Sequence, residues 1–172
     1  IIAIILGAAM TALIYPFIPT LFALLNSDAG MVELGSSYWE IRMFSMIFMG
    51  INYAYRGYFN GIGEPKYYMF SLIFIHILNI ALNYVFIFGH FGFAAMGTDG
   101  AALASTIAVV AGSLLYLSIS VFGLKSLSLF KFKPELRDVL SVFKLTLPAG
   151  FQQFLIAVGM SSLFWMAGRI GV

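Results

Sequence analysis

Three polar side chains lie close together in an otherwise apolar stretch of the sequence: His76, Asn79 and Asn83. Helical steps of three and four residues place them on one face of a helix. The two carboxamides, one turn apart, could present two carbonyl oxygens to one cation, or they could hydrogen-bond a carboxylate on a neighbouring helix. Asn and His also commonly join membrane helices through hydrogen bonds without any further role. Spacing alone leaves the functional and the packing interpretation open.

His76 is the one ionisable group deep inside an apolar stretch, because His90 falls in a predicted loop. Its imidazole could change charge near neutral pH, which makes it a candidate proton sensor or carrier. The alternative is a hydrogen-bonded packing residue. Asn52 lies deep in another stretch and is a candidate for lining a cavity. Gln152 and Gln153 are further candidates, although adjacent helical residues point in different directions, so at most one faces a given cavity.

The composition indicates that membrane helices must carry these residues. The chain has 172 residues, of which 62% are hydrophobic and 9% are charged, whereas an ordinary soluble domain has about 25% charged residues. So few charges cannot form a polar surface, and the net charge of +2 is too small to indicate a nucleic-acid partner. The absence of cysteine excludes disulfides, thiolate metal sites and cysteine nucleophiles. No catalytic motif is present, so we expect no enzyme.

Stretches without charge define five predicted transmembrane helices. Asp, Glu, Lys and Arg are absent from residues 1–27, 43–55, 67–98, 100–124 and 145–168. Spanning the hydrocarbon core takes about 20 apolar residues in a helix. We therefore predict an all-α polytopic membrane protein with helices over residues 2–25, 38–59, 67–88, 100–122 and 147–168. Pro16 and Pro19 should kink the first helix. A cleaved signal peptide is the alternative for that stretch, but no basic segment precedes it.

The basic residues predict the topology and a surface helix. Seven of the nine Lys and Arg side chains lie in residues 56–66 or 123–146, which the positive-inside rule places in or next to the cytoplasm. Between residues 134 and 144, Leu136, Val139, Leu140 and Phe143 recur with helical periodicity. This pattern predicts a short amphipathic helix on the cytoplasmic surface, and a solvated charged linker is the alternative.

Four runs of sequence resemble the MATE (multidrug and toxic compound extrusion) family, particularly its NorM-like branch. Residues 58–66 (YFNGIGEPK) are similar to a cytoplasmic turn of that family, and residues 79–89 (NIALNYVFIFG) to its fifth helix. Residues 97–105 (GTDGAALAS) and 147–153 (LPAGFQQ) resemble the starts of its sixth and seventh helices. The resemblance implies helices three to seven of a twelve-helix transporter made of two bundles. The chain also starts inside an apolar run, so we expect it to be part of a longer protein.

The resemblance further implies a domain division and a location. Residues 1–123 would be the last four helices of the N-terminal six-helix bundle, and residues 124–146 a cytoplasmic linker that includes the amphipathic helix. Residues 147–172 would then begin the C-terminal bundle. The expected location is the plasma (inner) membrane of a bacterium. The expected partners are the lipid bilayer, small organic substrates and the remainder of the same transporter chain, with no nucleic acid.

The resemblance also implies a function: an antiporter that exports organic, often cationic, compounds and is driven by inflow of Na⁺ or H⁺, without any other cofactor. The family's cation site combines an Asp of helix one with two Asn/Asp positions of helix five and a hydroxyl of helix six. Asn79, Asn83 and Ser105 match the last three positions, so they are the expected ligands of Na⁺ or of the proton-carrying group. Two alternatives are a lipid or lipid-linked-oligosaccharide flippase of the same superfamily and a structural membrane subunit without transport.

Overall fold

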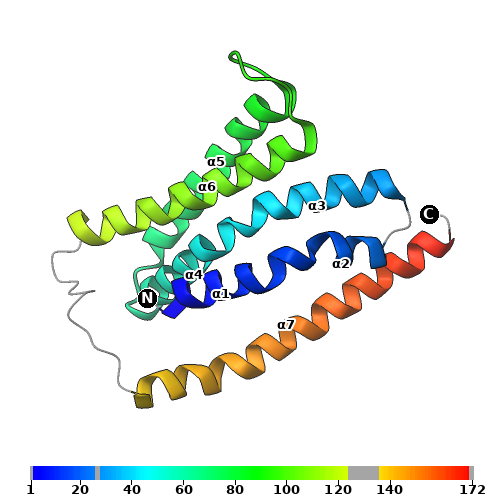
Figure 1. Cartoon of the computed structure of the whole chain (residues 1–172). Coiled ribbons are helices and arrows are strands. Elements are labelled where there is room, and N and C mark those ends of the chain that lie inside the picture. Colours follow the sequence, from blue (N-terminus) through cyan, green and yellow to red (C-terminus); the bar gives the residue numbers. More distant parts are fainter. Residues whose placement is uncertain (1, 26–27, 124–135, 171–172) are drawn as a thin grey trace. The chain divides into compact units, whose positions relative to one another are not determined.

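The computed structural model describes residues 2–25, 28–123 and 136–170; most of these residues are helical, with no strand among them (Figure 1). The elements are α1 (Ile2–Ile14), η1 (Tyr15–Phe17), α2 (Ile18–Leu25), α3 (Ala29–Met43), α4 (Ser45–Gly61), α5 (Pro65–Phe88), α6 (Gly97–Ser118), η2 (Ile119–Gly123) and α7 (Leu136–Ile170). The chain divides into two compact units, Ile1–Leu127 and Ser128–Val172, which are described separately below. The predicted all-α fold is confirmed.

The first apolar stretch is interrupted at its prolines, as the sequence predicts. The 3₁₀ turn η1 contains Pro16, and Pro19 follows directly at the start of α2. Proline lacks the N–H that would continue the α-helical ladder. The N–H of Ile18 instead bonds to the carbonyl of Tyr15, three residues back, which is the 3₁₀ pattern. The stretch from Ile4 to Leu24 nevertheless remains long and apolar enough to cross a membrane.

The second predicted span is wrong in its bounds, because two helices meet where one was expected over residues 38–59. Helices α3 and α4 occupy residues 29–61 and are interrupted at Phe44. The hydroxyl of Ser45 donates to the carbonyl of Arg42 at 2.7 Å, and a serine that bonds back to the preceding turn bends a helix. Within the part of the chain that the structure describes, four stretches therefore qualify as spans by length and composition: Ile4–Leu24, Pro65–Phe88, Gly97–Val121 and Val139–Leu163.

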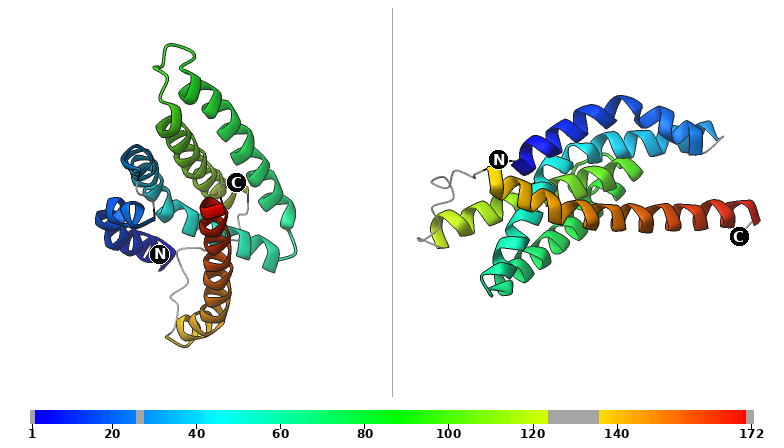
Figure 2. Two further views of the ribbon diagram at one scale, coloured as in Figure 1. Left: turned by 90° about the vertical axis from the view of Figure 1, so that its right-hand side faces the viewer. Right: turned by 90° about the horizontal axis from the view of Figure 1, so that it is seen from below.

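Helices α5 and α6 form an antiparallel pair joined by residues 89–96 (Figure 2). Gly89 ends α5 with φ of 74°, a left-handed conformation that suits glycine. The N–H of Met96 bonds to the carbonyl of Phe86 at 2.9 Å, which brings the start of α6 back onto the end of α5. The two helices match the predicted spans over residues 67–88 and 100–122 within three residues at their starts.

Helix α6 is the centre of the first unit, since it packs against α3, α4 and α5. Its buried residues are small along most of its length: Gly100, Ala102, Ala104, Ala108, Gly112 and Ser113. Small side chains let neighbouring backbones approach closely. Where α6 reaches α4 and the start of α5, the core becomes aromatic. Tyr55 and Phe59 stack there on Tyr116, with ring centroids 5.3 and 5.9 Å apart.

The second unit contains one long helix, α7, of 35 residues. The segment predicted as a separate amphipathic helix, from residue 136 onward, continues without interruption past Pro148 into the apolar stretch. Residues 124–135 of the predicted linker lie outside the described residues. The candidate span Val139–Leu163 begins inside the predicted surface helix, so the predicted surface segment and the candidate span belong to one continuous helix.

Candidate functional site

The two asparagines of α5 and the serine of α6 lie together in a hydrogen-bonded row. Asn83 donates through Nδ2 to Oδ1 of Asn79 at 3.1 Å, and Asn79 donates through Nδ2 to the hydroxyl oxygen of Ser105 at 3.1 Å. All three residues are half-buried. The spacing of four residues on α5 sets the first contact, and the close packing of α5 on α6 sets the second. The structure therefore brings together the three residues that the sequence analysis proposed as one site.

This row leaves one acceptor free. The Oδ1 atom of Asn83 is buried and has no hydrogen-bond partner among the described residues. A buried carbonyl oxygen without a donor costs about 1–3 kcal/mol, so such atoms in native structures call for an explanation. A carboxamide oxygen is an ordinary ligand for a hard cation and an ordinary acceptor for a carboxylic acid proton. The free acceptor thus distinguishes this row from a set of hydrogen bonds that only joins two helices.

His76 does not join the row. Its side chain is exposed within this chain, and no hydrogen bond of it occurs among the described contacts, although it lies on the same helix one turn before Asn79. Helical spacing predicts a shared face, but the row turns toward α6 through Ser105. His76 is thus placed beside the row and outside its hydrogen bonds, and its proposed proton role stays a prediction.

Asn52 joins helices α4 and α6. Its Nδ2 donates to the carbonyl of Val109 at 3.3 Å, and its Oδ1 accepts from the hydroxyl of Ser113 at 3.0 Å. Ser113 is buried and also lies 3.1 Å from the carbonyl of Phe48 on α4. Both polar ends of the Asn52 amide are therefore satisfied within the bundle, which is the role of interhelical hydrogen bonding. These contacts favour packing over the cavity-lining role predicted from the sequence.

Gln152 and Gln153 lie on α7, in the second unit, and both are exposed there. Exposure within this unit fits residues that line a cavity and residues that contact other helices equally well. Their predicted cavity role therefore stays a prediction. The same unit holds the cationic side chains Arg137 and Lys144, which flank a shallow surface depression with Leu140 and Ser141.

The sequence analysis did not single out Arg42, whose side chain is partly buried in the structure. Because α3 begins at Ala29, Arg42 lies in its last turn, about 20 Å along the helix from its start. Its Nη1 atom is buried without a hydrogen-bond partner among the described residues. The serine that interrupts the helix, Ser45, bonds to the backbone carbonyl of this same residue. The signal available in the sequence was a charge three residues before a serine, and this pattern does not reveal a helix break.

Comparisons with known proteins agree on one family. The sequence model of the MatE family matches residues 1–85. The chain is 26% identical over 174 residues to the probable multidrug resistance protein YoeA of Bacillus subtilis (strain 168), covering 96% of this chain and 37% of that relative. It is 34% identical over 105 residues to the probable multidrug resistance protein NorM of Bacillus cereus (strain ATCC 10987 / NRS 248), covering 58% of this chain and 23% of the relative.

Solved structures share the fold. One, described as the inward-facing conformation of a multidrug resistance MATE family transporter of the MOP superfamily, matches with a TM-score of 0.86 over 99% of this chain and 38% of the other, at 24% identity. Another, of MATE in the bent conformation, matches with a TM-score of 0.82 over 92% of this chain and 35% of the other, at 23% identity. The chain thus spans less than two fifths of the length of these relatives.

Proposed function

Because this chain belongs to the MATE family, we propose that it is part of a secondary active transporter that exports drugs and other organic compounds. The proposed mode is antiport against Na⁺ or H⁺ across the plasma (inner) membrane of a bacterium, and the proposed role is transport without enzymatic catalysis. The observation that carries the proposal is the row of Asn79, Asn83 and Ser105 with its buried free acceptor on Asn83. The row is the proposed site of coupling.

The chemistry of the row defines which ligand atoms it offers to the coupling ion. Carboxamide and hydroxyl oxygens are neutral ligands, and cations bound in membranes need a charge partner to offset desolvation. The row supplies the Oδ1 atom of Asn83 and the hydroxyl of Ser105, and a carboxylate from another segment would complete the site, as the family resemblance implies. Since amides do not titrate near neutral pH, these residues can ligate Na⁺ directly. In proton coupling they would orient the carboxylic acid that carries the proton.

Export from cells tests the proposal. We expect Asn83→Ala to weaken binding of the coupling cation by about 10- to 100-fold and to reduce export of a cationic dye correspondingly. Asn52→Ala is the matched control, because it removes the same amide from the interior of the bundle at a residue whose amide nitrogen and oxygen both bond to α6. Expressed at equal levels from the natural gene, the control should retain export. Equal export by wild type and Asn83→Ala would refute the coupling site.

The same cells separate the alternatives. A structural subunit predicts that neither asparagine variant changes export and that wild type exports no dye. If the protein is a lipid flippase, the cells should export no dye. Vesicles that contain the purified protein should then show accelerated movement of labelled lipid from one leaflet to the other. In such vesicles, dye uptake under a Na⁺ gradient is then compared with dye uptake under a pH gradient. Only a gradient of the coupling ion drives uptake of the dye, so the comparison identifies that ion.

A further inference from the structure

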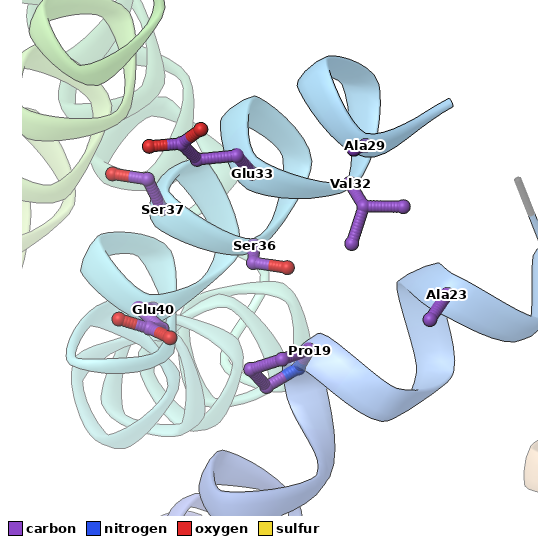
Figure 3. A pocket seen from close by; sticks show the side chains of 8 residues that line it. All are labelled: Pro19, Ala23, Ala29, Val32, Glu33, Ser36, Ser37 and Glu40. Atoms are coloured by element: carbon purple, nitrogen blue, oxygen red, sulfur yellow. The ribbon is translucent and has the colours of Figure 1, made fainter. Parts of the chain in front are cut away.

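Two polar side chains at the cleft between α2 and α3 face away from the cleft. The cleft has a volume of about 610 Å³ and is bordered on α2 by Pro19 and Ala23 (Figure 3). Figure 3 shows Glu33 and Ser37 on the side of α3 that lies away from these two residues. The hydroxyl of Ser37 donates to Oδ1 of Asp99 on α6 at 2.7 Å. Neither side chain offers a polar group to a molecule in the cleft, in contrast to two cations on a surface of α7.

A depression on α7 is bordered by these two cations. It has a volume of about 410 Å³ and is lined by Arg137, Leu140, Ser141 and Lys144. Steps of three, four and seven residues place the four side chains on one face of the helix. Both cationic side chains are exposed, and neither forms an ion pair among the described residues. Since the hydroxyl of Ser141 donates to the carbonyl of Arg137 at 2.8 Å, the two cations are the side-chain donors that remain in this depression for an anion.

The position of Lys144 calls for an anionic partner at the membrane surface. Lys144 lies inside the candidate span Val139–Leu163, where a charge is costly unless its long side chain reaches the interface. Arg137 lies about 10 Å nearer the start of α7, which the positive-inside rule places in the cytoplasm. Both side chains are long and flexible, so both can reach one phosphate group at the bilayer surface. Charge-assisted hydrogen bonds to phosphate are among the strong ones that Arg and Lys form.

The same face of α7 continues as an apolar surface. Leu147, Phe151 and Leu155 follow Lys144 at steps of three and four residues, and each is more than half exposed. From Lys144 to Leu155 the helix rises about 16 Å, which is close to half the thickness of a hydrocarbon core of about 30 Å. Cations at the surface and apolar side chains through one leaflet match the two parts of a phospholipid.

We propose that the α7 stripe, formed by Arg137, Lys144, Leu147, Phe151 and Leu155, binds an anionic phospholipid of the cytoplasmic leaflet. The cations hold the phosphate, and the apolar residues contact an acyl chain. Residues 124–146 contain five Lys or Arg and two Asp or Glu, and a basic segment next to a span attracts anionic lipid. The lipid is bound and not transported, so the proposal holds or fails independently of the transport function proposed above.

Quenching of a single tryptophan by brominated lipid tests the site. Phe151→Trp places the reporter in the apolar part of the stripe, and Trp39, Trp165 and any tryptophan elsewhere in the protein are replaced by Phe. The full protein encoded by the natural gene is reconstituted into phosphatidylcholine vesicles with increasing amounts of brominated phosphatidylglycerol. A second series with brominated phosphatidylcholine gives the reference, and the ratio of the two binding constants is the lipid preference. Gln153→Trp is the matched control reporter, because a residue two positions along a helix points to another side.

Phe151→Trp should report a preference for phosphatidylglycerol of about 10- to 30-fold, because each basic side chain near a membrane surface contributes about fivefold. Adding Arg137→Gln and Lys144→Gln should make the two binding constants equal, whereas the conservative pair Arg137→Lys and Lys144→Arg should retain the preference. Lys66→Gln, which removes the same charge from the first unit, should leave the preference unchanged. Gln153→Trp should report a smaller preference. Glycerol 3-phosphate in solution should not reduce the quenching.

Four results would overturn the proposal. Equal quenching of Phe151→Trp by the two lipids excludes an anionic-lipid site on this face of α7. A preference that survives the double glutamine substitution, or that Lys66→Gln removes, means that other charges select the lipid. An equal preference at Gln153→Trp means that anionic lipid surrounds the helix without a defined site. Displacement by glycerol 3-phosphate means that the occupant is a soluble phosphate. Because quenching requires neither dye nor an ion gradient, loss of transport with a retained preference would refute only the transport proposal.

Discussion

The backbones of α5 and α6 approach each other closely at Gly100, near the start of α6. A Cβ atom at this position would lie 2.6 Å from the carbonyl oxygen and 2.7 Å from the carbonyl carbon of Phe86 on α5. Both atoms belong to the backbone, so no side chain can rotate to make room. Gly100→Ala must therefore push α5 and α6 apart at the end where Met96 bonds to Phe86.

The cost can be estimated from the geometry. Overpacking a tightly packed interior by one methyl group costs about 1–3 kcal/mol when neighbours must move. At this chain length each kcal/mol corresponds to about 2–4 °C, so the melting temperature should fall by about 2–12 °C. The displacement also acts on the row farther along the pair, because Asn79 reaches Ser105 by one hydrogen bond of 3.1 Å. A shift of about 1 Å would break that bond.

Gly57→Ala is the matched control. Gly57 lies inside α4, is exposed, and has no atom within 4 Å of the position that a Cβ would take. The same substitution there should raise stability by about 0.5–1 kcal/mol, because alanine restricts the unfolded chain and favours helix. Both variants are heated in detergent, and the folded fraction that remains is measured by size-exclusion chromatography. The melting temperature should shift in opposite directions for the two variants.

The second readout is the dependence of the melting temperature on the coupling ion. Wild type and Gly57→Ala should be stabilised equally by a saturating ion concentration, whereas Gly100→Ala should gain less. A melting temperature of Gly100→Ala at or above that of wild type would refute the contact between the two backbones. A lowered melting temperature with undiminished stabilisation by the ion would refute the link between the helix contact and the row.

Two further variants test the packing of the bundle. Phe59→Ala should lower the unfolding free energy by about 3–5 kcal/mol, because this side chain is fully buried in the aromatic cluster with Tyr55 and Tyr116; unchanged thermal unfolding would contradict that placement. Asn52→Ala should lower stability by about 0.6–1.7 kcal/mol, the range measured for hydrogen bonds between membrane helices, while the affinity for the coupling ion stays as in wild type. A change in ion affinity would show that Asn52 belongs to the binding site.

The sequence predicted the spans of α5 and α6 well because charge cannot lie in lipid at low cost. The charge-free stretches that contain these spans begin directly after Lys66 and Asp99, and α5 and α6 begin one and two residues before these positions. Pro16 likewise predicted the interruption of the first stretch, since a missing N–H acts on its own helix and needs no neighbour. Local rules of this kind can be applied to a sequence without knowledge of packing.

To predict which residues form the site, both the spacing within one helix and the packing of α5 on α6 must be known. The spacing of Asn79 and Asn83 fixes their mutual hydrogen bond, because it depends on one helix alone. Ser105 lies 26 residues from Asn79 in sequence and is joined to it only by the packing of α5 on α6. Helical spacing alone also places His76 on the same face of α5 as the asparagines. Which part of that face meets α6 depends on how the two helices pack. Spacing alone therefore predicted the asparagine pair. The grouping of Ser105 with that pair came only from the family resemblance, and the exposure of His76 was not predicted.

The break at Phe44 shows why a helix interruption cannot be predicted from the sequence of one segment alone. It lies beside the other interruption of the bundle, because the ring of Phe44 packs edge-on against that of Tyr15 in η1, with centroids 6.1 Å apart. The hydroxyl of Thr11 on α1 lies 3.2 Å from the carbonyl of Met43, and Ser45 bonds the carbonyl of Arg42. Carbonyls freed by a helix break in a membrane must find donors, and one of these donors comes from another helix. The break is therefore a property of the pair of interrupted helices, and sequence patterns within residues 38–59 cannot contain it.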